Sequence, residues 1–357
     1  MTRRYVVIGA GAVGAALAAG LSDASIPVVL VSRGATAVAI RERGLVVAHG
    51  GVTRTLDVPV VTEPTDLALT ADDILVFAVK TQDAATALAQ WSSRPVSRED
   101  GSIGTAGADV VAVTLQNGLE ADRLALRHFD RVIAGVTLIA AQHVVPGRVD
   151  VFNGPRWGQL ILGAYPSASA RPATAKVVDA IVTDLDAAQW LAQAVAAPSR
   201  WKAWKLTLAV TFGVGVVAGE VESLDLLRAE ARAEATDVLR LAGYDIADPA
   251  AETSYDSTQA AVVPSPEFDA THLSPWQSFA RGAGSEIDFL NGEIALLARQ
   301  HGASAPVNTA LQQLLGVAAA RRDRPGTVTD HDVRVHVARH ATAHPTIVHP
   351  HQQGAAA

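Results

Sequence analysis

The 357-residue sequence contains no cysteine, which excludes disulfide bonds, thiolate metal ligands and a cysteine nucleophile. Aromatic residues make up only 5% of the chain and charged residues 18%, whereas hydrophobic residues reach 49%, a composition typical of a soluble globular protein. Acidic residues exceed basic ones, and the formal charge of −7 argues against non-specific binding to nucleic acid. The length suits two domains better than one small core.

Long hydrophobic runs are also missing. No segment reaches the roughly eighteen uninterrupted apolar residues of a membrane-spanning helix, and the apolar residues 203–217 are interrupted by Lys205. The N-terminal residues Met-Thr-Arg-Arg-Tyr lead directly into an apolar strand, which is not the pattern of a signal peptide. We therefore expect a cytoplasmic protein that does not enter a membrane.

A glycine-rich turn near the N-terminus is the most informative feature that is present. An apolar strand at residues 5–8 runs into Gly9-Ala10-Gly11-Ala12-Val13-Gly14, followed by an alanine-rich helix and a second apolar strand at residues 28–31. This is the strand–turn–helix context that a G-x-G-x-x-G motif needs. Gly9 allows the turn, Gly11 leaves room for a pyrophosphate, and Gly14 lets the helix pack close to the strand; the helix N-terminus then faces the diphosphate. We predict that residues 9–14 bind a dinucleotide; the alternative is a glycine-rich turn without a ligand.

The end of the second strand indicates which dinucleotide is bound. NAD sites usually carry an acidic residue there, to accept a hydrogen bond from the ribose 2′-hydroxyl, but this sequence has Ser32 and Arg33. A hydroxyl and a guanidinium suit a 2′-phosphate, which a carboxylate would repel. The pair favours NADP(H); the alternative for Arg33 is a solvated surface arginine.

The first half of the chain alternates apolar runs with helical stretches, which predicts a parallel, doubly wound α/β sheet. Turn residues within 136–165 predict antiparallel strands added at the sheet edge, and the Gly-, Ser- and Pro-rich residues 94–109 predict a loop. The expected strands cover residues 5–8, 28–31, 45–48, 57–61, 74–77, 110–114 and 132–139.

From about residue 198 the apolar positions recur at three- and four-residue spacing, which predicts an all-α domain. The expected helices cover residues 201–217, 224–241, 279–301 and 309–321, with a strand-poor loop at 247–272. We therefore assign a Rossmann-type NADP-binding domain to residues 1–195, a helical substrate and catalytic domain to 196–322, and a mobile tail to 323–357. His336, His340 and His344 would share one helix face in this tail. A metal site is the alternative there, but no acidic partner is evident, so a solvated tail is favoured.

Further polar motifs occur at two predicted strand ends and in the helical region. Val79-Lys80 and Gln116-Asn117-Gly118 follow apolar strands, at the edge where open α/β sheets bind ligands. The helical region carries Trp201-Lys202-Ala203-Trp204-Lys205-Leu206, Ser274 and Glu286-Ile287-Asp288 with Leu290-Asn291-Gly292.

With these motifs in order, together with residues 40–45, 135–137 and 306–308, the chain resembles the ketopantoate reductase family from residue 1 to about residue 318. The resemblance implies an N-terminal Rossmann domain, a helical C-terminal domain and NADPH-dependent reduction of a small 2-oxo acid. The oligomeric state stays open, a homodimer included.

The resemblance also implies roles for individual residues. Lys205 matches the family's catalytic lysine, which would stabilise and protonate the carbonyl oxygen, with Lys202 as the competing candidate. Glu286 matches the glutamate that orients this lysine and the cofactor ribose. Ser274 and Asn117 match substrate-binding residues, Asn117 also lying beside the nicotinamide, while Lys80 and Ala141 match cofactor contacts. The alternatives are an exposed charge for Lys80 and Glu286, a snorkelling lysine for Lys205, a helix cap for Ser274 and turn chemistry for Asn117.

The sequence departs from the family pattern where two asparagines would hold the substrate. Ala209 and either Phe212 or Gly213 occupy those positions, and Ser278 replaces an aspartate. Losing these hydrogen-bonding groups weakens discrimination for a polar substrate. The leading hypothesis is reduction of ketopantoate or a close relative; the alternatives are an NADPH-dependent reductase of a bulkier, less polar ketone and a non-catalytic NADP-binding sensor.

Overall fold

The computed structural model describes residues 3–167, 172–266, 268–269 and 273–341, which form two compact units. The first comprises the described part of Met1–Lys205 together with Ala247–Asp269, and the second comprises Leu206–Ile246 with the described part of Ala270–Ala357. The division differs from the expected boundary after residue 195, because most of helix α7 (Pro198–Ala209) belongs to the first unit.

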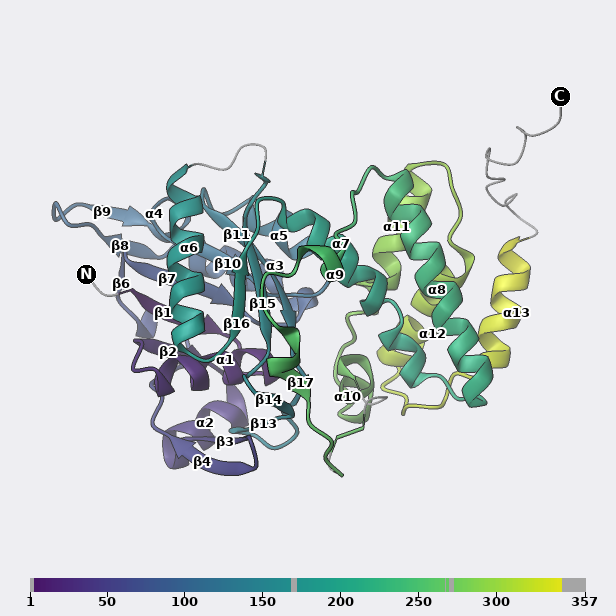
Figure 1. Ribbon diagram of the computed structural model, residues 1–357, viewed down its shortest axis with the longest axis horizontal. Coiled ribbons are helices and arrows are strands. Elements are labelled where there is room, and N and C mark those ends of the chain that lie inside the picture. Colours follow the sequence, from purple (N-terminus) through teal and green to yellow (C-terminus); the bar gives the residue numbers. More distant parts are fainter. Residues whose placement is uncertain (1–2, 168–171, 267, 270–272, 342–357) are drawn as a thin grey trace. The chain divides into compact units, whose positions relative to one another are not determined.

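An eight-stranded sheet forms the centre of the first unit (Figure 1). From edge to edge its strands are β16 (Leu191–Ala194), β15 (Gln159–Tyr165), β11 (Val132–Leu138), β10 (Val111–Thr114), β7 (Asp73–Phe77), β1 (Arg4–Ile8), β2 (Val28–Val31) and β5 (Val60–Val61). Strands β11 to β5 are parallel, whereas β15 pairs antiparallel with β11 and β16 runs parallel to β15. The predicted doubly wound sheet is confirmed. Of the antiparallel strands expected at its edge, β15 is present, but β16 lies outside it as the edge strand.

Helices cover both faces of this sheet because alternate strand residues point to opposite sides. Tyr5 and Val7 of β1 pack in one buried cluster with residues of α1 and α6, and Val6 and Ile8 pack in another with residues of α3 and α5. The helices of this unit are α1 (Ala12–Asp23), α2 (Gly34–Arg43), α3 (Thr81–Ser92), α4 (Ala106–Asp109), α5 (Glu120–Ala125), α6 (Pro172–Ala187), α7 and α9 (Pro249–Glu252).

Smaller sheets surround the central one, and they correct two sequence predictions. Residues 94–109 are not a loop, since they contain β8 (Pro95–Ser97), β9 (Ile103–Thr105) and α4; β8 and β9 form a hairpin that extends β6 (Leu69–Thr70). Part of the segment 136–165 forms a separate sheet instead of the edge of the main one. Its strands are, in order, β12 (Ala141–Gln142), β13 (Arg148–Val151), β3 (Leu45–His49) and β4 (Val52–Leu56).

Most of the segment expected as a loop of the helical domain, residues 247–269, belongs instead to the first unit. Its strand β17 (Ala260–Val262) pairs antiparallel with β14 (Asn153–Pro155). The Asn153 amide, which is buried, donates to the Ala260 carbonyl at 2.7 Å. This pairing joins residues 107 positions apart, so the local pattern gave no sign of it.

The second unit is built from helices, as predicted, although two of the expected helices are shorter or broken. Helix α7 stops at Ala209 and is followed by a 3-10 turn, and the predicted helix 279–301 is split. The helices are η3 (Phe212–Val216), α8 (Val221–Leu241), α10 (Ser274–Ala280), η5 (Ile287–Phe289), α11 (Asn291–Gln300), α12 (Pro306–Ala320) and α13 (Asp330–Ala341). Leu227, Leu311 and Leu315 are fully buried in their shared core.

Helix α13 corrects the prediction of a mobile tail beginning at residue 323. Val333 is completely buried in the core of the second unit. Thr329 and Asp332 form a reciprocal cap at the start of the helix, since the Thr329 backbone N–H donates to Asp332 and the Asp332 N–H donates to the Thr329 hydroxyl. His336 contacts Gln313 at 2.8 Å, and His344 lies outside the described residues.

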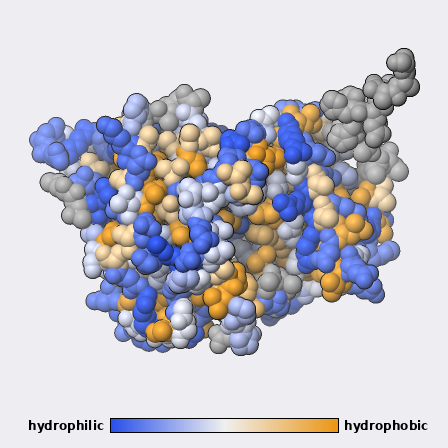
Figure 2. All heavy atoms as spheres, in the orientation of Figure 1, coloured by the Kyte–Doolittle hydropathy of each residue, from blue (hydrophilic) through white to orange (hydrophobic). Residues whose placement is uncertain are grey.

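The surface shown in Figure 2 is dominated by hydrophilic residues, with apolar residues scattered between them in small groups. Among the described residues, the helices are too short or too polar to cross a bilayer. The same residues contain no cluster of histidine and acidic side chains that could hold a metal ion.

Candidate active site

The glycine turn has the geometry that its sequence predicts. Gly9 has a φ of 111°, in the region that favours glycine, and an added Cβ there would lie 2.8 Å from the Val79 nitrogen. A Cβ on Gly14 would lie 1.9 Å from the Gly9 carbonyl oxygen, so the close approach of helix and turn requires glycine at this position. A Cβ on Gly11, in contrast, meets nothing within 4 Å. Helix α1 begins there without a side-chain cap. The turn therefore offers an open, glycine-lined helix N-terminus that fits a diphosphate.

Ser32 and Arg33 follow strand β2, and they differ in exposure. Ser32 is 8% exposed, whereas the Arg33 side chain is 60% exposed. The Arg33 guanidinium donates to Gln90 at 3.2 Å and lies 3.5 Å from the half-exposed carboxylate of Glu63. Arg33 is thus a surface arginine with two weak partners, and its side chain is accessible to an anion.

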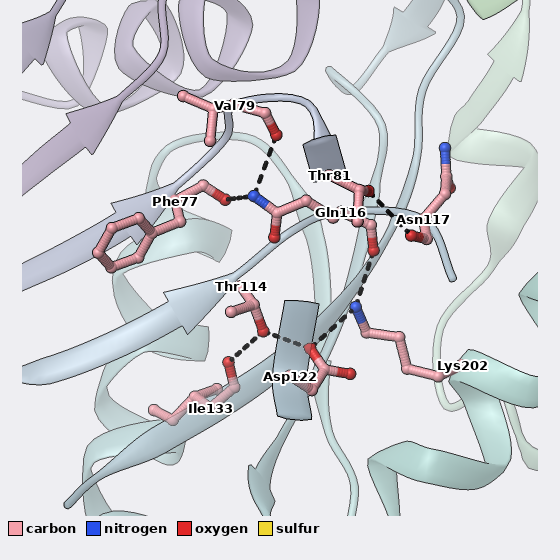
Figure 3. A network of polar contacts seen from close by, with 9 residues as sticks. All are labelled: Phe77, Val79, Thr81, Thr114, Gln116, Asn117, Asp122, Ile133 and Lys202. Atoms are coloured by element: carbon pink, nitrogen blue, oxygen red, sulfur yellow. Dashed lines mark hydrogen bonds and ion pairs between the residues drawn. The ribbon is translucent and has the colours of Figure 1, made fainter. Parts of the chain in front are cut away.

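Two of the predicted polar motifs lie at the carboxyl ends of β7 and β10. Lys80 immediately precedes α3, and the Thr81 hydroxyl donates to the Asn117 carbonyl at 3.5 Å. The buried Gln116 amide donates to the carbonyls of Phe77 and Val79, at 3.0 Å each. Gln116 therefore joins the ends of the two strands, and Asn117 extends from that junction (Figure 3).

Helix α7 carries two lysines with different environments. Lys202 is 1% exposed; its ammonium lies 3.3 Å from Asp122 and donates to the Gln116 carbonyl at 2.8 Å. Lys205 is half-buried, and burial lowers its pKa from 10.5 to about 8. The Lys202 ammonium is therefore engaged by a carboxylate and a backbone carbonyl of the first unit.

Ser274 and Glu286 belong to the second unit. Leu273, not Ser274, is the N-cap residue of α10, so Ser274 is not the cap that was the alternative to a substrate role. Glu286 is 6% exposed and precedes η5, which rules out the alternative of an exposed helix charge. The Ser278 hydroxyl donates to the Ser274 carbonyl at 3.1 Å within α10.

The positions that depart from the family pattern are buried or half-buried. Ala209 is fully buried. A Cβ on Gly213 would lie 2.8 Å from the Ile287 Cδ1 and 3.2 Å from the Leu315 Cδ1, so a larger side chain at this position would displace these two methyl groups. Phe212 is half-buried. In the first unit, Ala141 lies on β12, paired with Val151.

Sequence reasoning missed the partners of Lys202. Asp122 is a buried carboxylate on α5, and it also accepts from the Thr114 hydroxyl at 2.5 Å. Asp122 stands among other charged residues, Glu120 and Arg123, so its sequence context gave no signal, and its partner lies 80 residues further along the chain. Only the folded structure identifies the pair.

The fold and the glycine turn define a class of protein, a nucleotide-binding Rossmann-type unit joined to a helical unit. Comparison with known families identifies the group within this class. The sequence model of ketopantoate reductase PanE/ApbA matches residues 5–167, and that of its C-terminal domain matches residues 204–319. The chain belongs to the ketopantoate reductase family, whose members are oxidoreductases that act on CH–OH and C=O groups.

Individual relatives are distant but cover almost the whole chain. A 2-dehydropantoate 2-reductase of Halobacterium salinarum is 26% identical over 327 residues, covering 90% of this chain and 99% of the relative. A crystal structure of a PanE/ApbA family ketopantoate reductase from Ralstonia eutropha is similar with a TM-score of 0.67, at 23% identity, covering 89% of this chain and 99% of that one. The ternary structure of D-mandelate dehydrogenase with NADH and anilino(oxo)acetate has a TM-score of 0.69 at 18% identity, again covering 89% and 99%.

Proposed function

We propose that this protein reduces a 2-oxo acid with NADPH, with ketopantoate or a close relative as the substrate. The observation that carries this proposal is the half-buried Lys205 on α7, which lies within the segment matched by the model of the family's C-terminal domain. Burial lowers the pKa of this ammonium group to about 8. A group with that pKa is largely protonated at neutral pH and can still release its proton.

The cofactor, when bound, supplies the hydride that reduces the carbonyl carbon. Residues 9–14 would hold its diphosphate, and Ser32 and Arg33 would hold the 2′-phosphate. Lys80 and Ala141 are the further contacts that the resemblance implies. The chain's own chemistry is then the stabilisation of the carbonyl oxygen as negative charge develops on it, followed by transfer of the Lys205 proton to that oxygen. The product is the 2-hydroxy acid, and Lys205 regains its proton from solvent.

Ser274 and Asn117 are the residues that we propose for substrate binding, and Glu286 for orienting Lys205 and the ribose. Burial of Glu286 supports the orienting role, because the surrounding atoms restrict the conformations of a buried carboxylate, whereas an exposed one rotates freely. Replacing Glu286 by Gln would preserve its shape and remove its charge, so a loss of kcat in that variant would support the orienting role.

A second candidate is a reductase of the same type that acts on a bulkier, less polar 2-oxo acid or ketone. Ala209 and Gly213 favour it, since neither side chain provides the hydrogen bonds that the family's asparagines supply. An assay of NADPH oxidation with ketopantoate, an aliphatic 2-oxo acid and an aryl 2-oxo acid separates the two candidates. Ketopantoate as the sole substrate would eliminate the second.

The experiment that tests catalysis replaces Lys205 by Ala. We expect kcat to fall by about 10²- to 10⁴-fold, the usual contribution of a positioned general acid, while the Kd of NADPH changes little. Lys176→Ala on α6, an exposed lysine, is the matched control and should retain full activity. NADPH binding to the wild-type protein without reduction of any carbonyl compound would instead favour a non-catalytic sensor.

A further inference from the structure

We propose that the buried pair of Lys202 and Asp122 is a positioning device that fixes helix α7 against the Gln116–Asn117 loop and thereby sets where Lys205 donates its proton. The inference rests on the proposed function, because it concerns the geometry of that reaction. It assigns no chemical step to Lys202 or Asp122.

The pair lies within the first unit and is almost completely buried. The Lys202 and Asp122 side chains are 2% and 3% exposed. Figure 3 shows the ammonium between two acceptors, the Asp122 carboxylate at 3.3 Å and the Gln116 carbonyl at 2.8 Å. One side chain of α7 thus binds both α5 and the loop after β10.

The partners of this pair are themselves fixed to the sheet. Asp122 accepts from Thr114, the last residue of β10, whose hydroxyl also lies 3.3 Å from the Ile133 carbonyl on β11. The Gln116 side chain donates to the end of β7 and to the residue that follows Ala78. These hydrogen bonds connect Lys202 of α7, through Asp122 and Gln116, to helix α5 and to the neighbouring strands β7, β10 and β11.

Stability alone is a poor explanation for this arrangement. Burying two charges costs several kcal/mol of desolvation per ion, and well-packed apolar residues often stabilise such a site equally well. Burial raises the pKa of Asp122, and the Lys202 ammonium and Thr114 hydroxyl oppose that shift. Hydrogen bonds and ion pairs have a preferred geometry, which apolar contacts lack. The contacts of Lys202 therefore specify one position of α7 along the loop.

This position of α7 bears directly on Lys205. Three residues advance an α-helix by about 4.5 Å and by about 300° of rotation, so Lys202 and Lys205 lie on one side of α7. Lys202 binds the carbonyl of Gln116, the residue immediately before Asn117. The helix bearing the proposed acid and the loop bearing the proposed substrate contact are thus joined by one ammonium group. A displacement of about 1 Å at such a site can cost about 10²-fold in rate.

The test uses Lys202→Met, with Asp122→Asn as a second variant that preserves the volume of the carboxylate. The matched control is Asp73→Asn. Asp73 is equally buried, is paired with Arg4 at 2.7 Å, and is the first residue of β7, at the opposite end of that strand. Its variant loses a buried charge of the same kind without touching the loop or α7.

We expect Lys202→Met to lower kcat about 10- to 100-fold, and Asp122→Asn less, with the Kd of NADPH unchanged. The primary isotope effect with deuterated NADPH should rise, because a misplaced acid makes the chemical step slower. Asp73→Asn should keep kcat within about twofold per folded molecule. Equal kcat in Lys202→Met and Asp73→Asn, after correction for the folded fraction, would overturn the inference.

Amide hydrogen exchange gives a readout that needs no activity. Lys202→Met should increase exchange at residues 115–118 and in α7 and leave β7 unchanged, whereas unchanged exchange in both segments would overturn the inference. The activity assay of the wild-type protein comes first, and a protein that reduces no carbonyl compound would contradict the proposed function. The exchange measurement tests the positioning of α7 separately, because it does not depend on activity.

Discussion

At the scale of single residues, Lys202 and Lys205 have different environments although they lie on the same helix. Both are lysines of one helix, separated by a single turn, and the sequence offered both as the proton donor. Lys202 is occupied by Asp122 and a backbone carbonyl, whereas Lys205 is half-buried with a lowered pKa. The motif predicted a lysine acid, but the contacts of Lys202 depend on residues 80 and 86 positions away, which no local pattern contains.

The lowered pKa of Lys205 predicts a pH profile. Proton donation needs the ammonium form, so kcat/KM for reduction should be level below about pH 8 and fall above it. The reverse oxidation needs the neutral amine and should rise through the same pH. Rates measured from pH 6 to 10 in both directions test this. A reduction rate that stays level up to 10.5, the ordinary lysine pKa, would argue against Lys205 as the acid.

Arg33 predicts the choice between NADPH and NADH. A charge-assisted hydrogen bond to a phosphate contributes about 1.5–3 kcal/mol, so Arg33→Ala should weaken NADPH binding about 10- to 100-fold and leave NADH binding unchanged. Glu63→Gln removes the carboxylate that competes for Arg33 and should strengthen NADPH binding. Isothermal titration with both nucleotides measures these affinities. Equal losses for NADPH and NADH in Arg33→Ala would exclude a 2′-phosphate contact.

At the scale of secondary-structure elements, the β1–turn–α1 unit was predictable because its determinants are consecutive in the chain. In the structure Gly9 has the positive φ of the turn, Gly11 leaves open space, and Gly14 allows the helix to approach the Gly9 carbonyl. The hairpin β8–β9 and helix α13 were not predicted. Three-residue strands give too few alternating positions to recognise, and the cap formed by Thr329 and Asp332 was overlooked in a region rich in Pro, His and Ala.

Two glycines of this unit allow packing and ligand binding to be separated. Gly11→Ala places a methyl group in open space, so we expect unchanged thermal stability but NADPH binding weakened at least tenfold, because the methyl occupies the path to the diphosphate. Gly14→Ala should lose both stability and binding, since its Cβ overlaps the Gly9 carbonyl. Thermal unfolding and nucleotide titration of the two variants give the comparison. Full NADPH affinity in Gly11→Ala would show that the diphosphate does not bind at this turn.

At the scale of the whole molecule, the chain divides into two units with separate cores, and the first contains the proposed nucleotide site. A ligand that binds only the folded state stabilises it by mass action. NADPH at 100 times its Kd should therefore add about 2.7 kcal/mol to the free energy of unfolding of the unit that binds it. Denaturant unfolding with and without NADPH measures this effect, with Gly11→Ala as the variant that should not respond. No stabilisation of the wild type at a saturating concentration would contradict nucleotide binding to the folded state.

The sequence by itself determined the class of each unit and the glycine turn, because hydrophobic period, glycine geometry and strand–helix alternation act over a few residues. It also indicated the family, through motifs in a fixed order. The tertiary structure decided that residues 247–269 join the first unit, that α13 packs on the second, and that Lys202 binds Asp122. Each of these depends on partners far apart in the chain, and such contacts are selected by the packing of the complete core and not by local propensity.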